Sequence, residues 1–269
     1  MIVHNFDPVF VNLGPIEIRW YSLAYILGII LGWVYATKII KLTSFKPSGF
    51  VAVNKLEFDE LLIYLVLGIV FGGRLGYVLF YNISYYSENL IEIFKFWQGG
   101  MSFHGGLLGI IVAIYLYSKK NQTNFFKYSD IVSCAAPIGL FFGRIANFIN
   151  GELIGKISTL PWATIFPDSD AIARHPSQIY QAILEGVVLF ILINFLAIKR
   201  KLIFKTGYIS SLFLIFYSIL RIFGEFFREP DSHIGYLFNY YSMGTILSLI
   251  TLIFGFFILI YIKNNEQNN

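Results

Sequence analysis

The sequence predicts an all-α integral membrane protein with seven transmembrane helices, an outward-facing N-terminus, a cytoplasmic C-terminus and a small extracytoplasmic cap formed by loops. The chain of 269 residues is 57% hydrophobic and only 13% charged, and its mean hydropathy of +0.67 lies above the usual range of soluble domains. Seven apolar runs are separated by short polar segments, and the density of positive charge alternates between these segments. One polytopic domain over residues 1–269 is therefore expected, with no soluble module attached.

Most of the seven runs approach the roughly 20 residues that an α-helix needs to cross a bilayer. The third and fourth runs are short or interrupted by glycine and proline, so their ends are harder to place. The expected spans are residues 20–40, 61–81, 103–118, 131–150, 179–197, 209–227 and 241–262. Residues 1–19 mix charged and apolar side chains and include Pro8 and Pro15, unlike a cleaved signal peptide, so the first span is expected to be retained.

The lysines and arginines predict the orientation, because short loops rich in positive charge stay in the cytoplasm. Twelve lie in one set of segments: Lys38, Lys41, Lys46, Lys55, Lys119, Lys120, Lys127, Lys199, Arg200, Lys201, Lys205 and Lys263. Five lie in the other: Arg19, Lys95, Lys156, Arg174 and Arg228. The richer set is expected to face the cytoplasm and anionic lipid. No stripe of basic and aromatic residues outside the spans favours nucleic-acid binding.

The remaining three arginines, Arg74, Arg144 and Arg221, lie inside apolar runs. An ionised guanidinium at bilayer depth costs roughly 2.5–3.5 kcal/mol, so three of them indicate a compensating anion or a polar cavity. Each precedes the outer end of an ascending span by six or seven residues, or roughly 10 Å along the helix axis. These arginines therefore predict an anion site in the outer leaflet.

Other polar residues are expected at the same depth. Arg221, Glu225 and Arg228 share one helix face, because their spacing is i, i+4, i+7. Tyr217 lies one turn before Arg221, and Asn147 lies one turn after Arg144. Glu152 lies at the outer end of the fourth span, and Tyr21 and His104 lie at the outer ends of descending spans.

Structural alternatives exist for several of these residues. Arg221 with Glu225 could form a structural ion pair, and Arg74 could serve helix packing or anchor a lipid phosphate. His104 beside several glycines could be a hydrogen-bonded structural residue. The single cysteine, Cys134, permits neither an intrachain disulfide nor a cysteine metal cluster, and the four histidines are too scattered to predict a metal site.

Residues 143–155, GRIANFINGELIG, resemble the signature of the bacterial prolipoprotein diacylglyceryl transferases. The resemblance extends through nearly the whole chain, including RWY at 19–21, GGRLGY at 72–77, GGMSFHGG at 99–106, RHPSQ at 174–178 and the segment 221–231. Ala146 stands where glycine is usual in the family, Lys156 where arginine is common and Ser158 where threonine is frequent. None of these departures removes a charge or a suspected catalytic group.

The resemblance implies a multi-pass enzyme of the bacterial cytoplasmic (inner) membrane, with its active site towards the outer leaflet. Such an enzyme moves the diacylglyceryl group of phosphatidylglycerol onto the lipobox cysteine of a preprolipoprotein, which is the first step of lipoprotein maturation. A thioether forms and glycerol phosphate leaves. The expected partners are therefore phosphatidylglycerol, a preprolipoprotein signal peptide and membrane lipid. We expect a monomer without a cofactor.

For that reaction the catalytic candidates are His104, Arg144 and Arg221. The two arginines would grip phosphate oxygens through paired hydrogen bonds as negative charge develops on the leaving group. His104 would accept the thiol proton near neutral pH, or the arginines would lower the thiol pKa and His104 would orient a headgroup hydroxyl. The substrate-binding candidates are Arg74, Arg144, Asn147, Glu152, Gly155, Tyr21, Tyr217, Glu225 and Arg228.

Two connecting segments are predicted to lie outside the bilayer core. In residues 82–100, the spacing of Leu90, Ile93, Phe94 and Trp97 is typical of an amphipathic helix lying in the membrane interface. That helix would border a lateral lipid entrance or act as a plain surface connector. Residues 151–177 are predicted to form a compact extracytoplasmic loop.

Other classes of seven-helix membrane protein fit the sequence less well. A retinal receptor would need a lysine in its last span, and residues 241–262 contain none. An anion transporter could use the same arginines, but inverted repeats are not evident. A structural phospholipid-binding protein stays as an alternative, and it would not require His104.

Overall fold

A computed structural model of the chain describes residues 2–14, 16–44, 47, 50, 52–95, 100–167, 169–230, 235–237 and 240–267. It is mainly helical, and it contains two compact units. The first comprises residues 1–39 and 130–269, and the second comprises residues 40–129. That the units belong to one polytopic domain stays a prediction.

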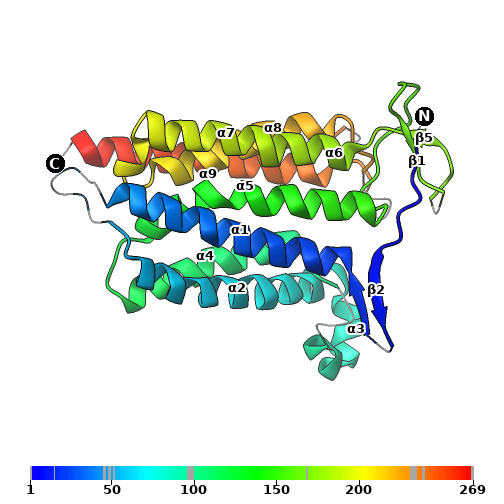
Figure 1. Cartoon of the computed structure of the whole chain (residues 1–269), viewed down its shortest axis with the longest axis horizontal. Helices are drawn as coiled ribbons and strands as arrows, with labels where there is room; N and C mark the ends of the chain where they lie inside the picture. Colours follow the sequence, from blue (N-terminus) through cyan, green and yellow to red (C-terminus); the bar gives the residue numbers. More distant parts are fainter. Residues whose placement is uncertain are drawn as a thin grey trace. The chain divides into compact units, whose positions relative to one another are not determined.

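The first unit is a bundle of long helices (Figure 1). It contains most of α1 (Trp20–Thr43) and α5 (Phe125–Ile149), then a continuous helix formed by α6 (Ser177–Gln181), η3 (Ala182–Val188), α7 (Leu189–Asn194) and η4 (Phe195–Lys199), the short η5 (Leu202–Phe204), α8 (Tyr208–Glu225) and α9 (Met243–Gln267). Leu189, Ile193 and Ile209 are fully buried between helices, whereas Ile253 and Phe257 of α9 are exposed. This burial of some apolar faces and exposure of others suits helices surrounded by lipid.

Short strands lie at the end of this unit where the N-terminus is found (Figure 1). β1 (Ile2–Val3) pairs in parallel with β4 (Thr164–Ile165), which pairs antiparallel with β5 (Ala173–Arg174). β2 (Val9–Leu13) and β3 (Ile16–Arg19) form an antiparallel hairpin. The alternation of apolar and polar residues in β3 explains the strand. The predicted cap of loops therefore contains five short strands among the residues that the structure describes.

A buried carboxylate fixes the beginning of α8 against α5. Asp130 is 2% exposed, and it accepts hydrogen bonds from the backbone N–H groups of Gly207 at 2.6 Å and Ser210 at 2.8 Å, and from the Ser210 hydroxyl at 2.6 Å. The first N–H groups of a helix have no partner within the helix and carry partial positive charge. Asp130 therefore caps α8 from a neighbouring helix. It fixes the N-terminal end of α8, the helix that carries Arg221 nearer its C-terminal end.

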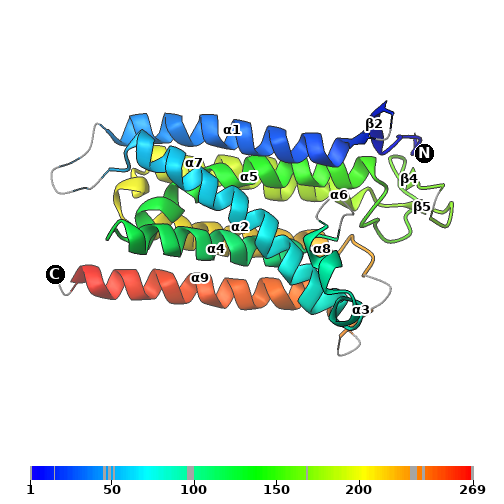
Figure 2. The same ribbon diagram turned by 90° about the horizontal axis from the view of Figure 1, so that it is seen from below.

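The second unit is built on two helices whose backbones touch. It contains α2 (Lys55–Tyr81), α3 (Ile83–Glu88), η1 (Leu90–Phe94) and α4 (Phe103–Lys120), and Figure 2 shows α2 crossing α4. A Cβ atom placed on Gly109 would collide with the backbone carbonyl of Gly68, whose carbon would lie only 2.6 Å away. A Cβ atom on Gly105 would lie 2.8 Å from Cα of Gly76. Glycines thus permit this close contact, as in many membrane helix pairs.

Six helices are long and apolar enough to cross a membrane: Trp20–Thr43, Lys55–Phe80, Phe125–Ile149, Ser177–Lys199, Tyr208–Glu225 and Met243–Glu266. They match six of the seven predicted spans, with ends that differ by six residues at most. The helix of the third predicted span, α4, has only 18 residues, which include His104, Lys119 and Lys120, and it is not among the six. The chain therefore has the helices of a multi-pass membrane protein, while the seventh crossing and the orientation of the termini stay predictions.

The predicted interfacial segment is helical but not one continuous helix. Residues 83–94 form α3 and η1, and Leu90 and Phe94 are exposed. Trp97, the last residue of the predicted apolar stripe, lies outside the described residues. The guanidinium of Arg74 donates hydrogen bonds to the carbonyl oxygens of Glu92 at 2.6 Å and Ile93 at 2.9 Å, which attaches the segment to α2.

Candidate anion-binding site

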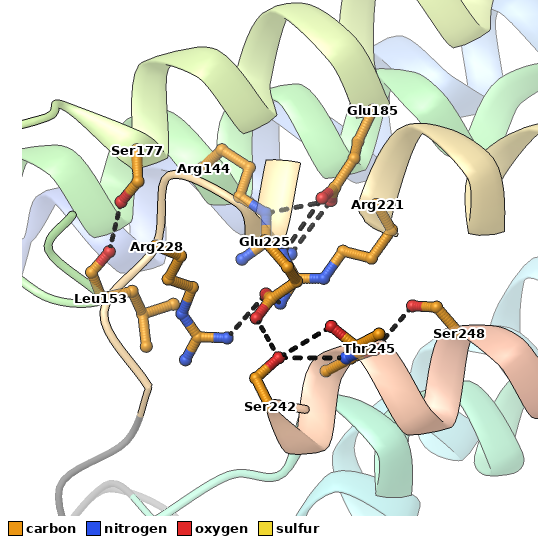
Figure 3. Close-up of polar contacts among 11 residues, drawn as sticks. Arg144, Leu153, Ser177, Glu185, Arg221, Glu225, Arg228, Ser242, Thr245 and Ser248 are labelled. Atoms are coloured by element: carbon orange, nitrogen blue, oxygen red, sulfur yellow. Dashed lines mark hydrogen bonds and ion pairs between the residues drawn. The ribbon is translucent and has the colours of Figure 1, made fainter. Parts of the chain in front are cut away.

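Five charged side chains form a connected cluster in the first unit, and we call Arg144, Glu185, Arg221, Glu225 and Arg228 the charge cluster. They come from α5, η3, α8 and the turn after α8. Figure 3 shows the three arginines directed towards the two carboxylates. Every one of these side chains is at most 11% exposed.

Glu185 connects two of the predicted catalytic arginines. Its Oε2 atom accepts hydrogen bonds from Nε and Nη2 of Arg144, at 3.1 and 3.0 Å. Its Oε1 atom accepts one from Nη1 of Arg221 at 3.1 Å. Because Glu185 is completely buried, its charge is screened little by solvent, and these ion pairs fix both guanidinium groups.

Glu225 extends the charge cluster towards α9. Its Oε1 atom lies 2.6 Å from Nη2 of Arg221 and 3.1 Å from Nη1 of Arg228. The hydroxyl of Ser242 donates to Oε2 at 2.7 Å. A Cβ atom on Gly244 would lie 2.7 Å from the Glu225 carboxyl carbon, so the absence of a side chain at Gly244 leaves room for Glu225.

The balance of charge in the cluster favours an anion. Three guanidinium groups and two carboxylates leave a net charge of +1 when all five are ionised. A phosphate group beside three guanidinium groups would gain from the low-dielectric environment, because charge-assisted hydrogen bonds are strong there. The described contacts of Arg144 involve only Nε and Nη2, so its Nη1 amino group can donate to such a ligand.

The predicted ion pair between Arg221 and Glu225 exists, but it belongs to this larger network. Tyr217, one turn below Arg221 on α8, is buried and lies within electrostatic reach of Glu185 and Arg221. The structure therefore brings Arg144, Arg221, Glu225, Arg228 and Tyr217 together. Their roles towards a substrate stay predictions.

Residues 150–155, which follow α5 and which we call the signature loop, take part in a second polar network. The amide of Asn147 donates to the Glu152 carboxylate at 3.1 Å and to the Tyr21 hydroxyl at 3.3 Å. Asn150 donates to the other oxygen of Glu152 at 3.3 Å. Glu152 itself is exposed. Three predicted substrate-binding residues, Tyr21, Asn147 and Glu152, thus contact one another through Asn147.

Gly155 lies where two other chain segments approach closely. A Cβ atom there would be 2.7 Å from Cβ of His175 and 2.8 Å from the carbonyl oxygen of Phe227. Its own carbonyl accepts a hydrogen bond from Arg174 at 2.9 Å. Arg174 also pairs with Asp170 and holds the pKa of that exposed carboxyl at about 2, so this ion pair persists at neutral pH. Glycine at this position allows the loop to pack against the residue segments that precede α6 and follow α8.

Arg74 and His104 belong to the second unit. Arg74 is 2% exposed, donates to Gly100 O at 3.2 Å in addition to its contacts with residues 92 and 93, and lies over the Tyr86 ring at 5.1 Å. These contacts give it a structural function. His104 is half-buried in the first turn of α4, where Ser102 caps the helix by accepting a hydrogen bond from Gly105 N at 3.2 Å. A substrate-binding role for Arg74 and a catalytic role for His104 stay predictions.

Glu185 was missed by the sequence reasoning, although a signal was present. It is a carboxylate inside the fifth apolar run, and the argument applied to the buried arginines applies equally to a buried acid. Its helix is also of the π type at this point, spanning Ala182–Val188. π-Helical turns within longer helices often occur at functional sites, but they cannot be recognised from local sequence.

Together, the six membrane-capable helices and the buried charge cluster define a multi-pass membrane protein with a group of paired arginines inside its helical bundle. Among the residues that the structure describes, no group of three His, Cys, Asp or Glu side chains is arranged to hold a metal ion.

Comparison with known proteins supplies the family. The family model for prolipoprotein diacylglyceryl transferase matches residues 8–261. Proteins named phosphatidylglycerol–prolipoprotein diacylglyceryl transferase are similar over nearly the full length. The one from Rickettsia bellii is 48% identical over 260 residues and covers 97% of each chain. That from Rickettsia canadensis is 50% identical over 255 residues, covering 95% of this chain and 96% of its own. That from Rhizobium meliloti is 47% identical over 244 residues, covering 90% and 87%.

The chain belongs to the prolipoprotein diacylglyceryl transferase family, as the resemblance of residues 143–155 predicted.

Proposed function

We infer that the protein transfers the diacylglyceryl group of phosphatidylglycerol to a prolipoprotein, the reaction named for its relatives. The observation that carries this inference is the buried charge cluster, with a net charge of +1 and two arginines fixed on Glu185. Such a cluster suits the phosphate of an anionic phospholipid. We place the protein in the bacterial inner membrane as a monomer, with the cluster towards the outer leaflet.

The acceptor is the thiol of the lipobox cysteine in the signal peptide. Its sulfur attacks the glycerol methylene carbon that is esterified to phosphate, a carbon–sulfur bond forms, and the carbon–oxygen bond breaks. The electron pair of that bond leaves with glycerol phosphate, so negative charge grows on the phosphate oxygens. Guanidinium groups already fixed near that phosphate stabilise the transition state without reorganising. We assign this role to Arg144 and Arg221.

Glu225 and Arg228 complete the phosphate environment, while Asn147, Glu152 and Tyr21 hold the signature loop beside it. The thiol proton goes to His104, because a neutral imidazole is a suitable base near pH 7. Thiolate is the reactive form of cysteine, whose free pKa of about 8.5 leaves little of it at neutral pH.

The substitution Arg144→Lys is expected to lower transfer about 100-fold, because lysine keeps the charge but cannot make the paired Nε and Nη2 hydrogen bonds to Glu185 while donating to phosphate. The measurement uses purified protein, phosphatidylglycerol and a lipobox peptide, and it follows glycerol phosphate release and the mass of the peptide. Arg200→Lys, at an exposed position, is the control and should retain full activity. Full activity of Arg144→Lys would show that transfer does not need a guanidinium that binds Glu185 through Nε and Nη2 and keeps Nη1 for the phosphate.

The substitution His104→Gln is expected to slow transfer strongly at pH 7 and to recover part of the rate near pH 9. The recovery follows because the thiol, with a pKa of about 8.5, then ionises without a base. The pH–rate profile of the variant, measured with the same peptide, tests this expectation. A loss of activity that is equal at both pH values would instead assign His104 to orienting the headgroup.

A further inference from the structure

Two glutamines of α6, in the first two turns of the continuous helix that carries Glu185, are completely buried. Gln178 and Gln181 each have 0% exposure. They lie on the face of the continuous helix that also carries Ser177 and Glu185. Neither glutamine is used by the mechanism described above.

Part of this helix face holds the signature loop. The Ser177 hydroxyl donates to the carbonyl of Leu153 at 2.7 Å, and Nε2 of Gln178 donates to the carbonyl of Glu152 at 2.5 Å. Because a carbonyl only accepts, this bond fixes which end of the Gln178 carboxamide is the NH₂ group. Its Oε1 atom is therefore the acceptor end of the carboxamide.

Three carboxamide atoms are buried without a hydrogen-bond partner in the described part of the chain: Oε1 of Gln178 and both Oε1 and Nε2 of Gln181. A buried polar atom that is left unsatisfied destabilises the folded state, and an apolar side chain of the same shape would avoid this cost. Three such atoms within one helical turn require an explanation that packing does not supply.

Their position connects them to the charge cluster. A Cβ atom on Gly224 would lie 3.2 Å from Cγ of Gln181, so this side chain packs on the turn of α8 between Arg221 and Glu225. One turn further along its own helix, Glu185 binds Arg144 and Arg221. The unpartnered atoms of Gln181 thus border the proposed phosphate site, and Gln178 lies one turn before Gln181, where its amide binds the carbonyl of Glu152.

The numbers of donors and acceptors restrict the ligand group. Two of the three atoms are acceptors, so the ligand must donate hydrogen bonds, which the ester and phosphate oxygens of a phospholipid cannot do. An ammonium headgroup could donate, but the neighbouring cluster already carries a net charge of +1. Hydroxyl groups both donate and accept, and they carry no charge. The glycerol headgroup of phosphatidylglycerol supplies two of them.

We propose that Gln178 and Gln181 hydrogen-bond the hydroxyl groups of the phospholipid headgroup and thereby select a glycerol headgroup over other alcohols. This proposal rests on the proposed function, because it assigns the donor lipid of the same site. A site built to hydrogen-bond a hydroxyl discriminates strongly against an analogue that lacks it, because its buried polar groups are then left unpaired.

The test compares phosphatidylglycerol with phosphatidylpropanol, whose headgroup lacks hydroxyls, in wild type and Gln181→Met. Wild type is expected to prefer phosphatidylglycerol at least about tenfold in kcat/KM, as one hydrogen bond can contribute. Gln181→Met should lose most of this preference by slowing only the phosphatidylglycerol reaction. Ile183→Met, on the exposed side of the same helix, is the control and should retain the wild-type preference.

Stability gives a second measurement. Because methionine removes two unsatisfied polar atoms, the lipid-free Gln181→Met protein should unfold at the same temperature as wild type or higher. A lower Tm, or an equal loss of rate with both lipids, would make Gln181 structural and overturn the proposal. Equal kcat/KM of the wild type with phosphatidylglycerol and phosphatidylpropanol would also overturn the proposal. Buried water would then be the hydrogen-bond partner of the carboxamides.

Failure of the proposed function itself would look different. Wild type would then transfer nothing from either lipid, and retention of the two lipids by the purified protein, measured by native mass spectrometry, would decide the headgroup preference. Preferential retention of phosphatidylglycerol that is lost in Gln181→Met supports the hydroxyl site. Equal retention overturns it.

Discussion

Replacing Glu185 by glutamine is expected to lower diacylglyceryl transfer at least about 100-fold and to lower the Tm of the purified protein clearly. Glu185 is fully buried and accepts three hydrogen bonds from Arg144 and Arg221. Removing one partner of a buried ion pair typically costs about 3–5 kcal/mol, because the remaining charge stays in a low-dielectric environment. Glutamine keeps the size of the side chain, so the change isolates the charge.

The loss of activity follows from the same contacts. With Glu185 neutral, the net charge of the cluster rises from +1 to +2, and only Glu225 remains to balance the three arginines. The guanidinium groups should then move apart or attract a solvent anion, and their geometry around the phosphate is lost. Glu229→Gln is the matched control, because Glu229 is 46% exposed and its ion pair with Arg174 is long, at 3.4 Å. It should alter rate and Tm little.

A double variant separates stability from catalysis. Combining Glu185→Gln with Arg144→Gln restores the net charge of +1, so part of the lost Tm should return, since neighbouring charges are not independent. Activity should stay low because a phosphate ligand group is missing. A Glu185→Gln protein with wild-type activity and unchanged Tm would contradict the claim that Glu185 holds Arg144 and Arg221 in place.

The sequence predicted the positive half of the charge cluster better than the negative half. Arg144 and Arg221 stand out as charges within apolar runs, and their depth in the helices follows from position alone. Glu225 was found because it lies one turn from Arg221. Glu185 comes from a different helix, and its pairing depends on how α5, η3 and α8 pack, which no local pattern specifies.

In the fold, too, features that depend on the local sequence were predicted, and features that depend on contacts between distant residues were not. Six membrane-capable helices match the apolar runs, because the length needed to cross a bilayer is a property of the run itself. The short parallel pairing of β1 with β4 joins residues 2–3 to residues 164–165. A local sequence pattern does not predict a pairing between residues so far apart in the chain. The buried contacts of Arg74 with residues 92, 93 and 100 depend on how the interfacial segment folds back.

The glycines of α2 and α4 provide a second variant with a large expected effect. Gly109→Ala should destabilise the protein by about 1–3 kcal/mol, the usual cost of overpacking, and Gly109→Val by more. The added Cβ atom would lie 2.6 Å from the carbonyl carbon of Gly68 and 3.2 Å from Cα of Gly72. These are backbone atoms, which cannot rotate away as a flexible side chain would. The two helices must therefore separate.

Gly106 offers a matched control within the same helix. A Cβ atom there would meet only the carbonyl oxygen of Ile69, at an ordinary 3.7 Å. Because alanine favours a helix over glycine by about 1 kcal/mol, Gly106→Ala should be neutral or slightly stabilising. Thermal unfolding of both variants in the same detergent measures the difference. Equal Tm values would show that the glycines do not determine the separation of α2 and α4.

The activity of the same pair then tests what the helix contact is for. His104 lies in the first turn of α4, five residues before Gly109, so a displaced α4 moves the proposed base relative to α2. We expect folded Gly109→Ala protein, assayed well below its Tm, to be slow at pH 7 and to recover near pH 9, like His104→Gln, because hydroxide replaces a misplaced base. A Gly109→Ala protein that is destabilised but fully active at pH 7 would confine this glycine contact to stability and weaken the assignment of His104.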